Sequence, residues 1–301
     1  MSPPHPPERA AAVPERGAPG QAPAGAGAPR SGSGLGALGG DDCLGGGDAL
    51  GSSDAVMLVA HGSADPRAAA TTRALGRAVA AARPGLDVRT AYLDHAGPRP
   101  GEVLAGFAAI GHPHAVVVPL LLTCAYHGRV DLPQVLATAA AGGVDLPVRV
   151  SDVLGPVAGV VPAPLLAALR RRLAEAAPDG YDAVVLAAAG TRDAGARETV
   201  DEAARALGEA LGVPCRAGYA SGPAPTAGEA VAQLRARGAR RVAAAAYFLA
   251  PGRLYAAAAG SARAAGAVAV AEPLGAAREL AHLVLARLDA AHRRRAPVQA
   301  A

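Results

Sequence analysis

The sequence contains no Trp, no Lys and no Asn, and aromatic residues make up only 3% of its 301 residues. A folded core must therefore be built mainly from Ala, Val and Leu, and the hydrophobic fraction of 51% is large enough for one. All positively charged side chains other than His are Arg, and they are scattered except for short runs at 170–172 and 293–295. Nucleic-acid-binding surfaces combine a basic stripe with aromatic platforms, so we expect no nucleic-acid partner.

Long apolar runs and paired cysteines are also missing. The longest apolar stretch, 115–126, is interrupted by Pro119 and Thr123 and is shorter than the ~18 residues of a membrane-spanning helix. The N-terminus has no apolar segment of the secretory type, and the three Cys residues form no CxxC pair. We therefore expect a cytoplasmic protein without membrane association, disulfides or a cysteine zinc site.

The two ends of the chain differ from its middle. Residues 1–54 are rich in Gly, Pro and Ala, contain no aromatic residue and show neither helical nor strand periodicity. Such a segment buries too little apolar surface to offset the entropy lost on ordering, so we expect a disordered tail. Residues 293–301 form a short basic tail.

Between these ends, short apolar runs alternate with longer Ala-rich segments, as in βαβ units around a parallel sheet. The pattern is written twice: AVMLVAHGSAD (55–65) aligns with AVVLAAAGTRD (183–193), and VVVPLLLTCAYHGR resembles the later VAAAAYFLAPGRLY. A repeat of this length indicates a duplication. We expect an N-terminal module over 55–178, a C-terminal module over 179–292, and a cleft between them.

Two histidines follow expected strands of the first module. His61 begins the His61-Gly62-Ser63 motif, and His127 follows the run 115–122. Ligands bind at the carboxyl ends of parallel strands, and a pair of imidazoles there can bind Co²⁺, Fe²⁺ or Ni²⁺ and accept protons. Either histidine could instead have a structural role and form a hydrogen bond to a neighbouring loop. The matching positions of the second module are Ala189 and Leu254, which favours one active half and one half without ligands.

These motifs resemble the sirohydrochlorin chelatase family of the CbiX/SirB type. LVAHGSADPRA, followed by VVPLLLTCAYHGRVDLP, carries the resemblance, which extends over 55–292. It implies two flavodoxin-like, chelatase-like α/β modules, each a parallel sheet flanked by helices. It also implies that His61 and His127 bind the metal and that Asp94 assists catalysis. Where the family often has Pro-Gly before its Tyr-His pair, this chain has Cys124-Ala125.

Other residues are candidates for the same cleft. Ser63 could bind the substrate or cap the next helix. The second module offers Arg192 and Arg253, whose guanidinium groups suit a substrate rich in carboxylates. His95 lies beside Asp94. Asp131 either orients His127 or caps the helix expected from residue 132, and the two alternatives remain open.

The resemblance implies insertion of Fe²⁺ or Co²⁺ into sirohydrochlorin without ATP, in siroheme or cobalamin biosynthesis. The divalent metal is then a substrate, and we expect no organic cofactor. We expect a monomer or a homodimer. A duplicated chain can close its own cleft as a monomer. The alternatives are a ferrochelatase that acts on coproporphyrin and a non-catalytic protein that binds a tetrapyrrole or a metal.

Overall fold

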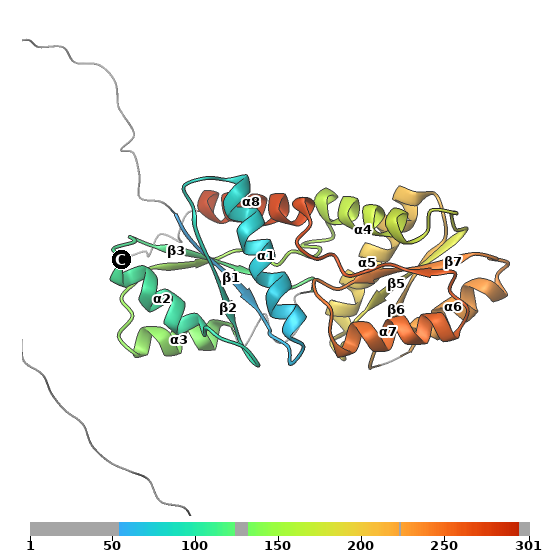
Figure 1. Ribbon diagram of the computed structural model, residues 1–301, viewed down its shortest axis with the longest axis horizontal. Coiled ribbons are helices and arrows are strands. Elements are labelled where there is room, and N and C mark those ends of the chain that lie inside the picture. The colour runs from blue at the N-terminus through green and yellow to red at the C-terminus, as the bar shows by residue number, and fades with distance from the viewer. Residues whose placement is uncertain (1–53, 124–131, 223, 295–301) are drawn as a thin grey trace, which may run out of the picture. The chain divides into compact units, whose positions relative to one another are not determined.

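A computed structural model describes residues 54–123, 132–222 and 224–294 (Figure 1). The tail expected over 1–54 lies outside these ranges except for its last residue, and so do His127, Cys124 and Asp131. Residues 49–301 belong to one structural unit. No helix within the described ranges is both long and apolar enough to cross a membrane.

The first half forms a four-stranded parallel sheet with the strand order β2-β1-β3-β4. Its strands are short and apolar, as expected for strands covered on both faces. The elements of this half are β1 (Ala55–Ala60), α1 (Pro66–Ala82), β2 (Asp87–Tyr92), α2 (Pro100–Ala109), β3 (Ala115–Pro119), α3 (Leu132–Ala141), β4 (Val148–Val150) and α4 (Ala163–Ala176).

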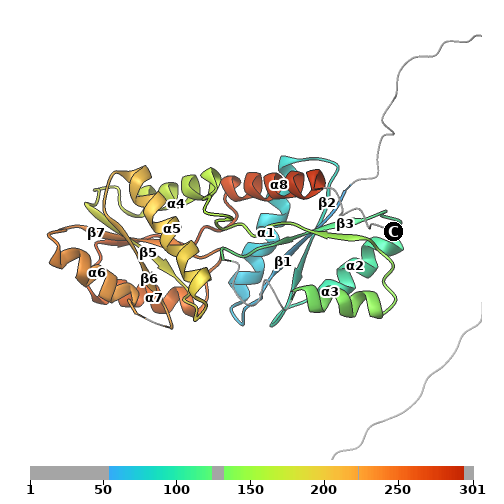
Figure 2. The same ribbon diagram turned by 180° about the vertical axis from the view of Figure 1, so that it is seen from behind.

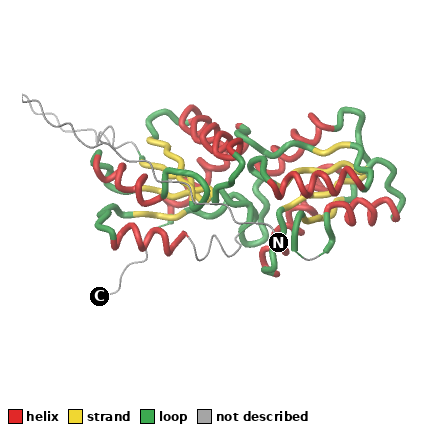
Figure 3. The backbone as a smooth tube through the Cα atoms, turned by 60° about the horizontal axis from the view of Figure 1, so that its bottom comes forward, coloured by secondary structure: helices red, strands yellow, loops and turns green. Residues whose placement is uncertain are grey.

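The second half repeats this topology with the strand order β6-β5-β7-β8. Its elements are β5 (Ala183–Ala188), α5 (Ala194–Leu211), β6 (Cys215–Tyr219), α6 (Ala227–Ala236), β7 (Val242–Tyr247), α7 (Arg253–Ala264), β8 (Ala269–Val270) and α8 (Arg278–Arg293). Figure 3 shows the two groups of strands, each flanked by helices. The predicted fold class, two similar α/β modules, is confirmed.

Each central strand buries side chains on both faces of its sheet. In β1, Val56 and Leu58 belong to one apolar cluster, whereas Met57 belongs to another that includes residues of α2 and α3. In β5, Val184 joins the same cluster as Val56, whereas Val185 packs with residues of α6 and α7. This alternation follows from the two-residue period of a strand. One continuous core therefore runs through both halves.

The fourth helix of each half packs on the sheet of the other half. Helix α8 contacts α1 and β3 of the first half, while α4 contacts α5 and β7 of the second half. The two helices also contact each other, and Figures 1 and 2 show them following one another along the same side of the two sheets. The halves are thus joined by an exchange of helices as well as by the chain.

The alternation of apolar runs and Ala-rich segments predicts the order of strands and helices in the structure except in one segment. The sequence pattern predicts no helix between the strand expected over 240–249 and the next one, but α7 occupies residues 253–264. Pro251-Gly252 reads as a turn, and the Ala-rich segment after it has few large apolar residues to mark a buried face. The sequence pattern predicts the last helix over 273–292, but it begins at Arg278, because Gly275 adopts a positive φ of 69°.

Candidate functional site

His61 lies at the topological switch point of the first sheet. It directly follows β1, and β1 lies between β2 and β3 in the sheet. The chain runs from β1 to β2 on one side and then returns across the sheet to β3, so the loops after β1 and β3 diverge from a common place. In open parallel sheets this is where ligands bind.

The backbone holds the end of β1 against the end of β2. The N–H of Leu93 donates to the carbonyl oxygen of Ala60 (3.0 Å), and the N–H of Asp94 donates to that of His61 (2.8 Å). Gly62 then turns the chain with a φ of 97°, a conformation that residues with a Cβ adopt only with strain. His61 and Asp94 are therefore held as neighbours by the backbone itself.

Asp94 is surrounded by groups that favour its ionised form. Its Oδ1 accepts the N–H of His95 (2.7 Å), and this bond lowers the pKa of the Asp94 carboxyl, with further contributions from the His95 side chain, Arg99 and His61. The Arg99 guanidinium lies 3.9 Å from Asp94 Oδ1. Asp94 is thus a carboxylate next to His61 that stays ionised and can attract a cation.

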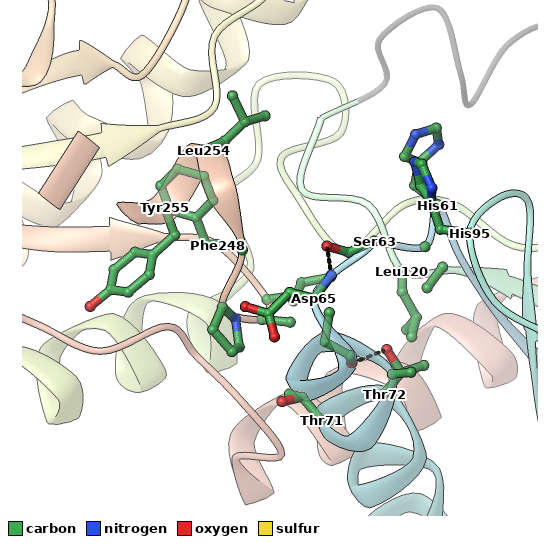
Figure 4. A pocket seen from close by; sticks show the side chains of 18 of the residues that line it. His61, Ser63, Asp65, Thr71, Thr72, His95, Leu120, Phe248, Leu254 and Tyr255 are labelled. Carbon is green, nitrogen blue, oxygen red and sulfur yellow. Dashed lines mark hydrogen bonds between the residues drawn. The ribbon is translucent and has the colours of Figure 1, made fainter. Parts of the chain in front are cut away.

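A cavity of about 480 Å³ opens beside His61 and is lined by residues of both halves. The first half contributes His61, Ser63 and His95, and Figure 4 draws the last of these close to His61. Ser63 Oγ accepts the N–H of Asp65 (3.1 Å), the residue that caps α1. The volume is in the range of small-molecule sites.

The second half supplies an aromatic and aliphatic wall to this cavity. Phe248 and Tyr255 lie across the cavity from Ser63 in Figure 4, with their ring centroids 5.8 Å apart. Leu254 also lines the cavity and is 45% exposed, so it offers apolar surface to a ligand. Arg253 adds a positive charge to the same lining.

The family of the chain follows from its sequence. The CbiX family model matches residues 55–176 and 183–291, one match in each half. The chain belongs to the CbiX family.

Solved structures show the same fold. The chain is similar to SirB from Bacillus subtilis with Fe³⁺, with a TM-score of 0.69 and 20% identity over 80% of this chain and 96% of that one. It is similar to SirB from Bacillus subtilis subspecies spizizenii in complex with cobalt, with a TM-score of 0.66 and 20% identity over 80% and 97%. A multi-domain protein from Deinococcus radiodurans with structural similarity to chelatases has a TM-score of 0.55 and 21% identity over 79% and 54%. No curated protein sequence matches the chain.

In this CbiX chain the residues singled out from sequence that lie within the described ranges fall into three groups, whereas His127 and Asp131 lie outside those ranges. His61, Ser63, His95 and Arg253 line the cavity. Asp94 borders His61 in a second hollow of about 760 Å³ that also contains Arg99. Arg192 is exposed and is not part of either lining, and its carbonyl oxygen accepts from Arg197 Nη1 (3.3 Å).

The second half of this CbiX chain repeats the backbone geometry around His61 and Asp94 without those two side chains. Gly190 turns with a φ of 95°, and the N–H of Ser221 donates to the carbonyl oxygen of Ala189 (3.1 Å), as Asp94 does to His61. Ala189 and Leu254, at the positions that match His61 and His127, both line the cavity. The duplicated half thus forms a wall of the cavity and offers no imidazole at those positions.

Sequence reasoning overlooked Arg99 and the aromatic wall. Arg99 precedes Pro100, so it reads as the start of an ordinary helix, yet it faces Asp94 and also donates to the carbonyl oxygen of Leu93. Phe248 reads as the end of a strand, and Tyr255 lies on the unforeseen α7. The sequence signal for this wall was the presence of two aromatic residues close to the end of a strand, because the chain contains few aromatics.

Proposed function

We propose that this CbiX protein inserts Fe²⁺ or Co²⁺ into sirohydrochlorin without ATP. The observation that carries the proposal is the position of His61, which lies beside the Asp94 carboxylate and on a cavity walled by both halves. A metal ligand, a proton acceptor and a tetrapyrrole-binding cavity then lie at one edge of the first sheet. The SirB structures with Fe³⁺ and with cobalt support a role in metal binding for this fold.

In the proposed reaction His61 and His127 bind the divalent metal. His127 belongs to the segment 124–131, outside the described residues, which follows β3 as His61 follows β1. As the metal forms bonds to the pyrrole nitrogens, two N–H protons leave the macrocycle. The imidazoles accept a proton as each releases the metal, and Asp94 passes protons to water.

The cavity lining suits a large apolar ring with an anionic rim. Phe248, Leu254 and Tyr255 offer apolar surface to a face of the macrocycle. Arg253 and Ser63 offer hydrogen-bond donors to its carboxylates. Arg192 is the weaker candidate for this role, because it lies outside the cavity lining.

Anaerobic metallation tests the proposal. The purified full-length chain, without ATP, is given sirohydrochlorin and either Fe²⁺ or Co²⁺, and the absorbance change of the macrocycle is followed through several turnovers. We expect catalytic turnover with at least one metal. Faster metallation of coproporphyrin than of sirohydrochlorin would replace the proposal by a ferrochelatase, and binding of sirohydrochlorin without turnover would replace it by a carrier.

A further inference from the structure

A second group of metal-ligating side chains lies at the opposite edge of the first sheet. Asp54 precedes β1, His114 precedes β3, and His292 lies in the last turn of α8. The three residues are far apart in sequence and are brought together because β1 and β3 are neighbours and α8 packs against β3. His61, by contrast, follows β1 at its carboxyl end.

The ligand atoms of this group converge without satisfying one another. His114 Nε2 lies 3.7 Å from Asp54 Oδ1, and His292 Nε2 lies 3.9 Å from Asp54 Oδ2. Both distances are longer than a hydrogen bond. His292 Nε2 is also buried from solvent without a hydrogen-bond partner among the described residues. A buried ring nitrogen of this kind needs a partner, and the space between the three residues is where one would lie.

We propose that Asp54, His114 and His292 bind a divalent cation of the Zn²⁺, Co²⁺ or Ni²⁺ type. Their ligand atoms all lie within 4.8 Å of one another. Ligand atoms about 2.1 Å from a tetrahedral metal lie about 3.4 Å apart, so each imidazole lies within a few tenths of an ångström of that spacing from one Asp54 oxygen, and no pair of the three ligand atoms exceeds it by more than about 1.4 Å. Two imidazoles and a carboxylate are a common ligand set for such metals, which complete their coordination with water.

The charge of Arg83, a neighbour of this group, is paired with a carboxylate. Arg83 interacts electrostatically with Asp54, but its guanidinium makes two hydrogen bonds to the Asp289 carboxylate (2.7 and 2.9 Å). Its charge is therefore largely balanced. All three proposed ligands keep 28–33% of the side chain accessible, so the group lies close to the surface even though His292 Nε2 itself is buried.

The proposed site would fasten α8 to the first sheet. Helix α8 comes from the second half of the chain and packs on β3 and α1 of the first. A metal held by His292 on α8 and by Asp54 and His114 at the sheet edge would resist separation of the two. The cation would then act on stability, independently of the metal that His61 handles in the proposed function.

Titration of the full-length chain with Zn²⁺ alone, and with Co²⁺ alone, tests this site. Two variants are compared. The first is His61→Ala, which leaves Asp54, His114 and His292 intact, and the second is the triple variant His61→Ala/Asp54→Asn/His292→Gln. The matched control adds His282→Ala, an exposed histidine on the same helix, to His61→Ala. We expect His61→Ala and the control to bind Zn²⁺, to gain several degrees in Tm with it, and to give a visible Co²⁺ spectrum typical of nitrogen ligands.

The triple variant should lose all three signals while keeping the circular dichroism of the parent. Equal Zn²⁺ affinity and equal Tm gain in the triple variant would overturn the proposal. If the triple variant does not fold, the double variant His61→Ala/Asp54→Asn replaces it. A weaker Zn²⁺ affinity than that of His61→Ala then supports the proposal, and an unchanged affinity overturns it. Asp54→Asn/His292→Gln in the wild-type chain should metallate sirohydrochlorin at the wild-type rate, so failure of the proposed function would be seen separately.

Discussion

Gly62 lies so close to Asp94 that a Cβ at position 62 would fall 1.8 Å from the Asp94 carbonyl oxygen. The second half repeats the relationship between Gly190 and Ser221, also at 1.8 Å. In each half the loop after the first strand therefore presses directly on the loop after the second. In the first half this contact sets the position of His61 next to the Asp94 carboxylate.

Gly62→Ala should lower stability and disable the site. A Cβ at a positive φ costs about 1–2 kcal/mol by itself, and here it also collides with backbone that cannot rotate away. Gly85→Ala is the matched control, since Gly85 has a φ of 92° and a Cβ added there would meet nothing within 4 Å. Urea unfolding should show a larger loss for Gly62→Ala than for Gly85→Ala, and equal losses would contradict the steric argument.

Replacing the proposed metal ligands should stop metal insertion without unfolding the chain. His61→Ala and His127→Ala each remove an imidazole, and a single imidazole holds a divalent metal weakly. Asp94→Ala should slow the reaction and leave measurable activity, because water can still take up protons. Initial rates of sirohydrochlorin metallation, with His282→Ala as the control, test this. Near wild-type rates in both histidine variants would show that other groups bind the metal.

The ion pair between Arg83 and Asp289 should make stability depend on pH. The hydrogen bonds from Arg83 lower the pKa of the Asp289 carboxyl. A carboxyl with a lowered folded-state pKa stabilises the fold above its unfolded pKa of about 3.9, and this contribution is lost as the pH falls through the folded value. The side chains are 37% and 39% exposed, so screening limits the effect to about 0.5 kcal/mol.

Urea unfolding of Asp289→Asn at pH 7 and at pH 3 measures this contribution. The variant should be less stable than the wild type at pH 7, and the difference should shrink at pH 3. Glu198→Gln is the control, because Glu198 is exposed on α5 and makes no hydrogen bond or ion pair within the described part of the chain. A difference that stays constant between the two pH values would exclude titration of Asp289 as its cause.

The strands were predictable because the first sheet and its copy are buried on both faces. Apolar runs such as 55–60 and 183–188 end at turn residues and recur in the same order. The exchange of α4 and α8 was not predictable, because the spacing of apolar residues marks the buried face of a helix without naming the sheet that it covers. The His61-Gly62 turn could be anticipated from sequence, whereas the cavity wall depended on α7.

Arg253→Ala should raise the KM for sirohydrochlorin with little change in kcat. Arg253 lines the cavity from the first turn of α7, and as a group that binds substrate carboxylates rather than the metal it would contact them equally in the ground and transition states. Loss of one charge-assisted hydrogen bond at an exposed position should weaken binding by up to about tenfold. Arg192→Ala should have the smaller effect, and a purely kcat effect of Arg253→Ala would assign this residue to the reacting centre.

Ala189→His should not give the chain a second metal-binding half. It restores an imidazole at the position that matches His61, but the positions that match His127 and Asp94 hold Leu254 and Ser221. A lone imidazole provides one ligand, and Ser221 Oγ already donates to the carbonyl oxygen of Ala189 (3.0 Å). Co²⁺ titrations should give the same number of bound ions for Ala189→His as for the wild type.

The combination Ala189→His/Leu254→His supplies two imidazoles on the cavity and should bind an additional Co²⁺. An additional ion bound by Ala189→His alone would mean that the second half contributes ligands of its own.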